Sequence, residues 1–344
     1  ADADDKLRGE AEYVGDMRVP GMLHGKVLRS PLPHARITSL DPSAAEALDG
    51  VVAVLTGADL AGTDPYWGHA IKDRPIVAID KVRHVGEPVA AVAAVDEATA
   101  EAALALIEVE NEELPVAGTI EEALATDAPL IQEKQIRPGL FHGLALDEER
   151  DGNVCYRYAI DHGDVDAIFD SADIVVEGDY EFPGVYQYSM ETHTVIADAR
   201  GADITVWATC QHPFLVRAEI SALFDVPLSR VRVIVPYLGG GFGSKSYTKM
   251  EPVTVALARK AGHPVRIQNR VDESMATTRR HGARFHMRTA ADAGGRLLAR
   301  EVDVDFDTGA YADNGPRVVA TGGDAAPGPY RWEAVRVRAA CVHT

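Results

Sequence analysis

A glycine-rich segment followed by a lysine and a serine is the part of the chain best suited to hold an anion or a cofactor. Gly239–Gly243 contains four glycines, and Lys245 and Ser246 follow closely. The stretch Val231–Val235 before it, rich in β-branched residues, predicts a strand, and the capping-box spacing within Thr248–Glu251 predicts the start of a helix after it. A glycine loop between a strand and a helix N-terminus offers unpaired N–H groups and the positive end of the helix dipole to an anionic ligand.

Several interpretations of this segment are open on its own residues. An ATP-type phosphate loop requires Gly-x4-Gly-Lys-Ser/Thr, and Ser244 stands where its second glycine belongs. A dinucleotide-binding Gly-x-Gly-x-x-Gly loop is broken at the same serine. A third interpretation is a loop that packs against a pterin and its metal. A turn that binds no ligand is about as frequent, because short glycine motifs often match by chance.

The chain divides into two parts that differ in their pattern of predicted strands and helices. Residues 1–118 alternate short apolar strands, such as Val51–Leu55, with alanine-rich helices, such as the one expected over Glu97–Leu106. This alternation predicts a layered module of strands and helices. Residues 119–155 are irregular and indicate a linker, and strand-like runs fill the second part, 156–344.

Composition narrows the class of protein. The 344 residues are 46% hydrophobic and 25% charged, which is typical of a folded domain, and the length favours two domains. The formal net charge of −19 argues against binding nucleic acid or an anionic membrane surface. We expect no transmembrane span, since no run of about 18 apolar residues occurs. The three cysteines are widely spaced, which indicates a reduced, cytoplasmic setting and no iron–sulfur or zinc site in this chain.

Further segments follow one another in a fixed order along the chain. In the first part they are Gly9–Asp16, Val27–Pro31, Pro33–Ile37, Val54–Leu60 and Val85–Ala90. In the second part they are Gly163–Ala167, Met190–His193, Thr209–Gln211, Gly239–Lys245 and Asp307–Tyr311. Together they resemble the N-terminal portion of the large, molybdopterin-binding subunit of the xanthine oxidase family of molybdenum hydroxylases. The resemblance implies an α+β fold, with an α/β-hammerhead domain followed by the first part of the molybdenum-cofactor-binding domain.

The resemblance also implies roles for individual residues. Gln211 matches the family's glutamine whose side chain hydrogen-bonds an oxo ligand of molybdenum, so it would touch the metal through that ligand. Gly240, Gly241, Phe242 and Gly243 match the loop whose backbone contacts the cofactor, where the glycines permit a close approach.

Three further polar residues are assigned less specific roles. Glu191 and His193 lie in a family motif that we interpret as structural, because a buried polar pair more often fixes a turn than takes part in catalysis. Lys245 could neutralise the pterin phosphate or could equally be a surface lysine.

Two departures from the family bear on the substrate. In members that oxidise purines, a glutamate follows the loop lysine and an arginine lies in the substrate pocket; here Ser246 and Thr321 occupy these places. The polar edges of xanthine would then be left unpaired, which is costly in a buried pocket. We therefore expect a pocket that includes Phe242, Ser246 and Thr321 and takes an N-heteroaromatic, aromatic or aldehyde substrate rather than xanthine.

The chemistry implied by the resemblance is hydroxylation with oxygen taken from water. In the family, the glutamate that acts as general base comes after the position of Thr344, so no catalytic residue is expected in this chain. The implied cofactor is molybdenum–molybdopterin, with a cytosine dinucleotide form as one option, and [2Fe–2S] clusters and FAD would sit on partner subunits.

The implied partners are therefore an iron–sulfur subunit, an FAD subunit, the remainder of the molybdenum subunit and a small-molecule substrate. The alternatives are a non-catalytic paralogue or scaffold subunit and, less favoured because of Ser244, a phosphotransferase with an ATP-type phosphate loop.

Overall fold

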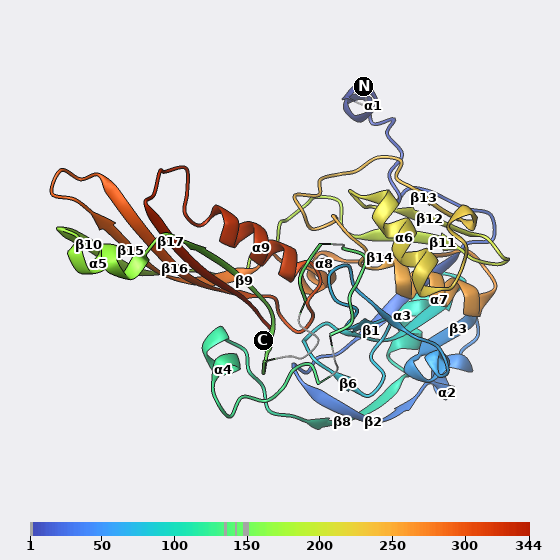
Figure 1. Cartoon of the computed structure of the whole chain (residues 1–344). Coiled ribbons are helices and arrows are strands. Elements are labelled where there is room, and N and C mark those ends of the chain that lie inside the picture. The colour runs from blue at the N-terminus through green and yellow to red at the C-terminus, as the bar shows by residue number, and fades with distance from the viewer. Residues whose placement is uncertain (1–2, 134–135, 142, 147–150) are drawn as a thin grey trace. The chain divides into compact units, whose positions relative to one another are not determined.

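The computed structural model describes residues 3–133, 136–141, 143–146 and 151–344, and Figure 1 shows their arrangement into helices and strands. The chain forms two compact units, each assembled from separate stretches of sequence. The first unit comprises Ala1–Trp67, Pro75–Pro115 and Tyr186–Arg280. The second comprises Gly68–Arg74, Val116–Val185 and His281–Thr344.

A seven-stranded sheet is the centre of the first unit, with the strand order β13-β12-β11-β14-β1-β7-β3. Its strands are β1 (Leu23–Arg29), β3 (Val51–Thr56), β7 (Pro88–Ala94), β11 (Thr194–Asp198), β12 (Ile204–Ala208), β13 (Val231–Ile234) and β14 (Val265–Gln268). The parallel pairing of β1 with β14 joins strands from the two sides of the predicted linker into one sheet.

Both faces of this sheet are covered by helices, which explains why every residue of β7 is buried. Ala91 and Ala93 belong to the core shared with α6 (Pro213–Leu223) and α7 (Glu251–Ala261). Ala90, Val92 and Ala94 point the other way, into the core shared with α2 (Ser43–Glu46) and α3 (Glu97–Leu104). Residues that alternate in a strand face opposite sides of the sheet, so the small side chains of β7 let both layers approach closely.

The helix ends test two of the capping signals in the sequence. Asp96 caps α3 by accepting a hydrogen bond from the Thr99 N–H at 2.7 Å, and the helix ends two residues before the predicted Leu106. The predicted capping box of Thr248 and Glu251 is wrong. Met250 occupies the N-cap position of α7 without a side-chain capping bond, and the Glu251 carboxylate accepts from the Lys249 N–H instead.

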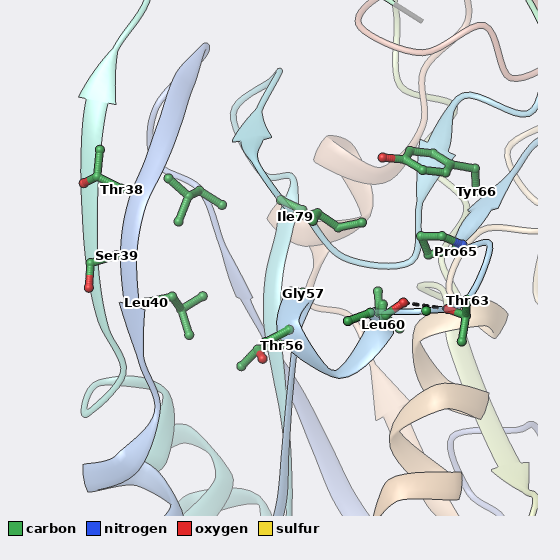
Figure 2. Close-up of a pocket in the computed structure, with 15 residues that line it drawn as sticks. Thr38, Ser39, Leu40, Thr56, Gly57, Leu60, Thr63, Pro65, Tyr66 and Ile79 are labelled. Atoms are coloured by element: carbon green, nitrogen blue, oxygen red, sulfur yellow. Dashed lines mark hydrogen bonds between the residues drawn. The ribbon is translucent and has the colours of Figure 1, made fainter.

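The rest of the first unit is made of short elements. They are α1 (Ala3–Arg8), β2 (Ala35–Asp41), η1 (Gly57–Leu60), β4 (Tyr66–Trp67), β6 (Lys81–Val82), β8 (Glu108–Glu113), η2 (Leu228–Arg230) and α8 (Val271–Thr277). β2 lies between β6 and β8 in a three-stranded sheet. An open hollow of about 580 Å³ lies against β2 and η1, and Figure 2 shows its mainly apolar and hydroxyl-bearing lining. No residue that the sequence predicts for the site lines this hollow.

A five-stranded sheet with the order β10-β15-β16-β17-β9 is the centre of the second unit. Its strands are β9 (Val154–His162), β10 (Ile174–Phe182), β15 (Gly282–Ala291), β16 (Leu297–Asp307) and β17 (Ala334–Val342). Three helices accompany it: α4 (Ile120–Leu124), α5 (Val165–Ser171) and α9 (Gly315–Ala325). β5 (Arg74–Pro75) lies where the chain passes between the two units.

Charged side chains form rows across this sheet, with the sign alternating from strand to strand. In one row Arg288 lies 3.5 Å from Glu177 and 2.8 Å from Glu301, and Glu301 lies 2.8 Å from Arg336. Opposite charges on directly paired residues favour one register, because a slip by one residue would turn each partner to the other face.

The stretch predicted as a linker, 119–155, is only partly described, since residues 134–135, 142 and 147–150 lie outside the described residues. It contains α4, whose N-cap Thr119 accepts a hydrogen bond from the Glu122 N–H at 3.2 Å. Across the described part of the chain, no helix has the length and hydrophobicity needed to cross a bilayer.

The close approach of β1 to β14 depends on Gly25. A Cβ atom on Gly25 would lie 2.6 Å from Ile267 Cγ1 and 2.8 Å from Val265 Cγ1, both in the middle of the sheet. We expect Gly25→Ala to lower the free energy of unfolding by about 1–3 kcal/mol, as overpacking of a core does. Denaturant-induced unfolding followed by circular dichroism measures the change.

Gly201→Ala is the matched control, because a Cβ atom there meets nothing within 4 Å. It should unfold as the unmodified chain does. An unchanged midpoint for Gly25→Ala would contradict the tight packing of β1 on β14.

Candidate functional site

The glycine loop follows β13, as the sequence predicts, but it does not lead directly into a helix. The segment Ser244–Met250 separates Gly243 from the first turn of α7 at Glu251. Most of this segment is buried, including the whole side chain of Lys245. The helix N-terminus is therefore not what faces a ligand at the loop, and the chemistry of the loop must come from its own backbone and neighbours.

The backbone of the loop adopts conformations that favour glycine at several positions. Gly240 and Gly243 have φ angles of 97° and 90°. Phe242 has a φ of 51°, a left-handed conformation that costs a non-glycine residue on the order of 1–3 kcal/mol. Its ring is 73% exposed. A strained residue that presents a large apolar side chain outward is typical of a loop shaped for a ligand rather than for the core.

The structure brings Gln211 against this loop, as the sequence predicts. The Gln211 N–H donates to the Lys245 carbonyl oxygen at 2.7 Å, and the Gly243 N–H donates to Gln211 Oε1 at 3.1 Å. A Cβ atom on Gly241 would lie 2.5 Å from the Gln211 amide carbon, so glycine is required there. Because Oε1 is held by the loop, the side-chain NH2 group of Gln211 is left to donate to another group.

The loop also offers backbone donors. Among the residues that the structure describes, no hydrogen bond engages the N–H groups of Gly240, Gly241 or Phe242. Unpaired N–H groups beside an exposed amide NH2 suit a ligand rich in acceptor oxygens, as a pterin phosphate and a metal–oxo group are. The residues present thus fit the cofactor that the resemblance implies.

Lys245 and Glu191 form a buried ion pair beneath the loop. Lys245 Nζ lies 2.9 Å from Glu191 Oε2, and its side chain is fully buried. The same Oε2 accepts the Gly239 N–H at 2.8 Å. Burial lowers the pKa of Lys245, although the hydrogen bond that its amine donates to Glu191 opposes that shift. The alternative of a surface lysine is therefore wrong, and the amine is turned to a carboxylate instead of a phosphate.

His193 supports the loop from a second point. Its Nε2 lies 3.1 Å from the Ser244 carbonyl oxygen, and burial lowers its pKa to about 4. The ring is consequently neutral near pH 7, and Nε2–H is the donor to Ser244. The structural role expected for Glu191 and His193 agrees with these contacts.

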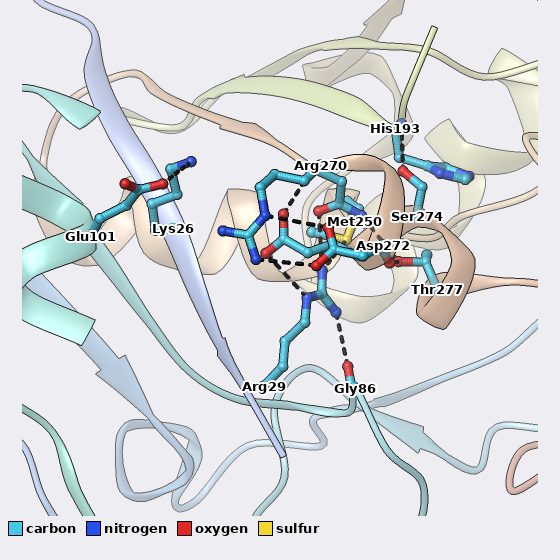
Figure 3. A network of polar contacts seen from close by, with 12 residues as sticks. Lys26, Arg29, Gly86, Glu101, His193, Met250, Arg270, Asp272, Ser274 and Thr277 are labelled. Atoms are coloured by element: carbon cyan, nitrogen blue, oxygen red, sulfur yellow. Dashed lines mark hydrogen bonds and ion pairs between the residues drawn. The ribbon is translucent and has the colours of Figure 1, made fainter. Parts of the chain in front are cut away.

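A polar network fixes the surroundings of His193, as Figure 3 shows. The His193 N–H donates to Ser274 Oγ on α8 at 3.2 Å, and the His193 carbonyl oxygen accepts from the Asn269 N–H at 2.9 Å. Arg29 donates to the Gly86 carbonyl oxygen at 2.9 Å and to Asn269 Oδ1 at 3.0 Å. The base of the loop is thereby tied to β1 and α8.

The two residues that suggested a less polar substrate lie in different units. Ser246 is half-buried beside the loop, and its carbonyl oxygen lies 2.6 Å from His212 Nδ1. Thr321 is exposed on α9 in the second unit. The structure thus groups Ser246 with Gln211 and Phe242, while a pocket that includes Thr321 remains a prediction.

The Lys245–Glu191 pair is the part of the site that sequence reasoning missed. The two residues are 54 positions apart, and neither pattern nor spacing links them. No residue next to either side chain indicates the other as its partner.

Two family models match parts of this chain. The family model of the molybdopterin cofactor-binding domain matches residues 146–344. The model of the aldehyde oxidase and xanthine dehydrogenase a/b hammerhead domain matches residues 8–115.

Individual relatives match along almost the whole chain. A probable xanthine dehydrogenase subunit of Bacillus subtilis is 38% identical over 98% of this chain, which spans 43% of that protein. The nicotinate dehydrogenase large molybdopterin subunit of Eubacterium barkeri is 36% identical over 100% of this chain, which spans 77% of it.

Two solved structures also match along the whole chain. The reconstituted CO dehydrogenase from Oligotropha carboxidovorans aligns with a TM-score of 0.91 and 29% identity, covering 100% of this chain and 44% of its own. Quinoline 2-oxidoreductase from Pseudomonas putida 86 aligns with a TM-score of 0.85 and 32% identity, covering 100% of this chain and 43% of its own.

The resemblance and the α+β fold expected from the sequence are confirmed by these matches. The chain belongs to the xanthine oxidase family of molybdenum hydroxylases and carries the family's hammerhead domain and molybdopterin cofactor-binding domain.

Proposed function

We propose that this chain is the molybdenum-cofactor-binding part of a hydroxylase that oxidises an N-heteroaromatic, aromatic or aldehyde substrate rather than xanthine, with oxygen taken from water. The single observation that carries the proposal is the set of free donors at the loop. Among the described residues, the Gln211 NH2 group and the N–H groups of Gly240, Gly241 and Phe242 have no hydrogen-bond partner. The molybdenum cofactor, when bound, supplies the two-electron oxidation and the oxygen atom.

In this proposal, the role of the chain's own residues is to bind the cofactor and to hold it in one orientation. The Gln211 NH2 group donates to an acceptor oxygen of the cofactor, and the Gly243 N–H keeps that amide from rotating away. The loop N–H groups hold further acceptor atoms without any side chain in the way. The exposed ring of Phe242 covers one side of the reacting region with apolar surface and helps to exclude water.

The phosphotransferase alternative is weakened by the burial of Lys245. An ATP-type loop needs its lysine to reach the phosphates, and here the amine lies in an ion pair with Glu191. The remaining alternative is a non-catalytic paralogue or scaffold subunit, and the metal content of the purified protein distinguishes it from an enzyme.

The whole enzyme requires groups beyond these residues. The chain spans 43% of the Bacillus subtilis relative, and we infer that the general base is a glutamate in the part that corresponds to the rest of that relative. We further infer an iron–sulfur subunit, an FAD subunit, a cytosine dinucleotide form of the pterin as one option, and a cytoplasmic location. The domain boundaries at 118 and 155 stay predictions.

We expect the complex purified with this chain to contain stoichiometric molybdenum and pterin. Elemental analysis and release of the oxidised pterin measure both. A complex that has all its subunits and no molybdenum would favour the scaffold alternative and refute the proposed function.

We expect Gln211→Glu to lower kcat about 10–100-fold, the usual cost of losing a group that orients the atoms around a metal. The carboxylate still accepts from the Gly243 N–H, but it cannot donate to the cofactor. Steady-state kinetics and thermal unfolding measure the two properties separately.

Gln268→Glu is the control, because Gln268 is an exposed glutamine at the end of β14 in the same unit. It should leave kcat and the unfolding temperature unchanged. Unaltered turnover in Gln211→Glu, or a collapse of its unfolding temperature, would show that Gln211 has only a structural role.

The substrate class can be tested with a small panel. We expect kcat/KM to be at least about tenfold higher for quinoline, nicotinate or benzaldehyde than for xanthine, because an unpaired polar group in a pocket costs on the order of 1–3 kcal/mol. Xanthine as the preferred substrate would refute the role given to Ser246 and Thr321, while leaving the assignment as a hydroxylase intact.

A further inference from the structure

We propose that the buried ion pair of Lys245 and Glu191 is a positioning element of the site: it joins the two ends of the glycine loop and so sets where Gln211 presents its NH2 group. This inference rests on the proposed function, since it concerns the same loop. It adds two positioning residues that do not touch the cofactor.

One carboxylate holds both ends of the loop. Glu191 Oε2 accepts the Gly239 N–H at 2.8 Å and the Lys245 amine at 2.9 Å. The Glu191 N–H also donates to the Gly239 carbonyl oxygen at 3.2 Å. A Cβ atom on Gly239 would lie 2.5 Å from Glu191 Cβ, so only glycine allows this approach. The distance between the start and the end of the loop is therefore set by Glu191.

The ends of the loop in turn set the position of Gln211. The Lys245 carbonyl oxygen accepts the Gln211 N–H at 2.7 Å, which fixes the glutamine backbone. The Gly243 N–H fixes its side-chain oxygen. A shift of Lys245 away from Glu191 would move both of these contacts, so the pair acts on the amide through hydrogen bonds of the main chain.

A gain in the free energy of folding does not explain why the pair of Lys245 and Glu191 is charged. Removing two ions from water is expensive, and a buried ion pair can often be replaced by uncharged side chains of similar shape without loss of stability. Glu191 Oε1 is moreover buried with no hydrogen-bond partner among the described residues. What the charges provide is a strong and directional attraction that selects one loop geometry.

The test compares single and double substitutions in the purified complex. Lys245→Met and Glu191→Gln each leave one charged partner buried, and both should lower the unfolding temperature and the molybdenum content. The double variant E191Q/K245M removes both charges and keeps the shape, and the glutamine can still accept from the Gly239 N–H. We expect its unfolding temperature to return close to the original value.

The turnover rate distinguishes a positioning role of the ion pair from a role in stability alone. We expect the double variant to keep a kcat reduced about tenfold or more, with a smaller change in KM, and to show an altered Mo(V) electron paramagnetic resonance signal. Recovery of the original kcat and signal along with the unfolding temperature would overturn the proposal, because the pair would then serve stability alone.

A control variant removes another buried lysine of the same unit. Lys26 lies 3.0 Å from Glu101, and Figure 3 shows this pair together with the network around Arg29. Lys26→Met should lower the unfolding temperature without changing the Mo(V) signal. A changed signal in this variant would overturn the proposal, because the signal would then report the loss of any buried lysine.

A second measurement keeps the proposal testable if the double variant does not fold. Hydrogen–deuterium exchange of the amides of Gly239–Lys245 should be faster in Glu191→Gln than in the unmodified complex, and unchanged exchange would overturn the proposal. The two levels of inference also separate: an unmodified complex without molybdenum refutes the proposed function, whereas a molybdenum-containing complex that is indifferent to the double substitution refutes only the positioning role.

Discussion

The site depends on an attraction between a lysine amine and a carboxylate that are both removed from water. Lys245 is fully buried, and Glu191 meets it with the same oxygen that accepts the Gly239 N–H. A loop rich in glycine has many accessible conformations, so its backbone cannot by itself keep several donors pointing to one place. The ion pair, with the His193 contact to Ser244, reduces that freedom. The unpaired N–H groups and the Gln211 amide are useful to a ligand only because this support exists.

Part of this arrangement is accessible from the sequence. The loop and Gln211 could be proposed as site residues through the resemblance, which implies that they contact a cofactor directly. The structure adds the reason why Gly241 must be glycine, which is the Gln211 side chain packed against it. The cap of α3 is likewise local, because Asp96 accepts from the N–H of Thr99, three residues further on. Interactions between residues that are close in the sequence can be predicted from a single sequence.

Contacts between residues that are far apart in the sequence could not be predicted in the same way. β1 pairs with β14, so that Leu23 lies opposite Val265. The residue pattern of either strand does not indicate which strand it pairs with. The capping box of Thr248 and Glu251 had the correct spacing and the helix starts within the predicted stretch, yet the N-cap position is Met250 and the Glu251 carboxylate accepts from the Lys249 N–H. The Lys245–Glu191 pair belongs to the same class. Such relations depend on which surfaces meet in the folded unit, and the sequence alone does not state that.

The rows of alternating charge in the second unit have a consequence for how separate molecules behave toward one another. They run to β10, a strand at the edge of its sheet, where Ile174, Val175 and Val176 are exposed. An open edge with branched apolar side chains is a template on which a second chain can add a strand. Glu177 and Asp179 interrupt this edge, and in a chain with a net charge of −19 they repel another copy that approaches it. Pairing of two copies through β10 would therefore bring like charges together, and rising ionic strength would weaken their repulsion.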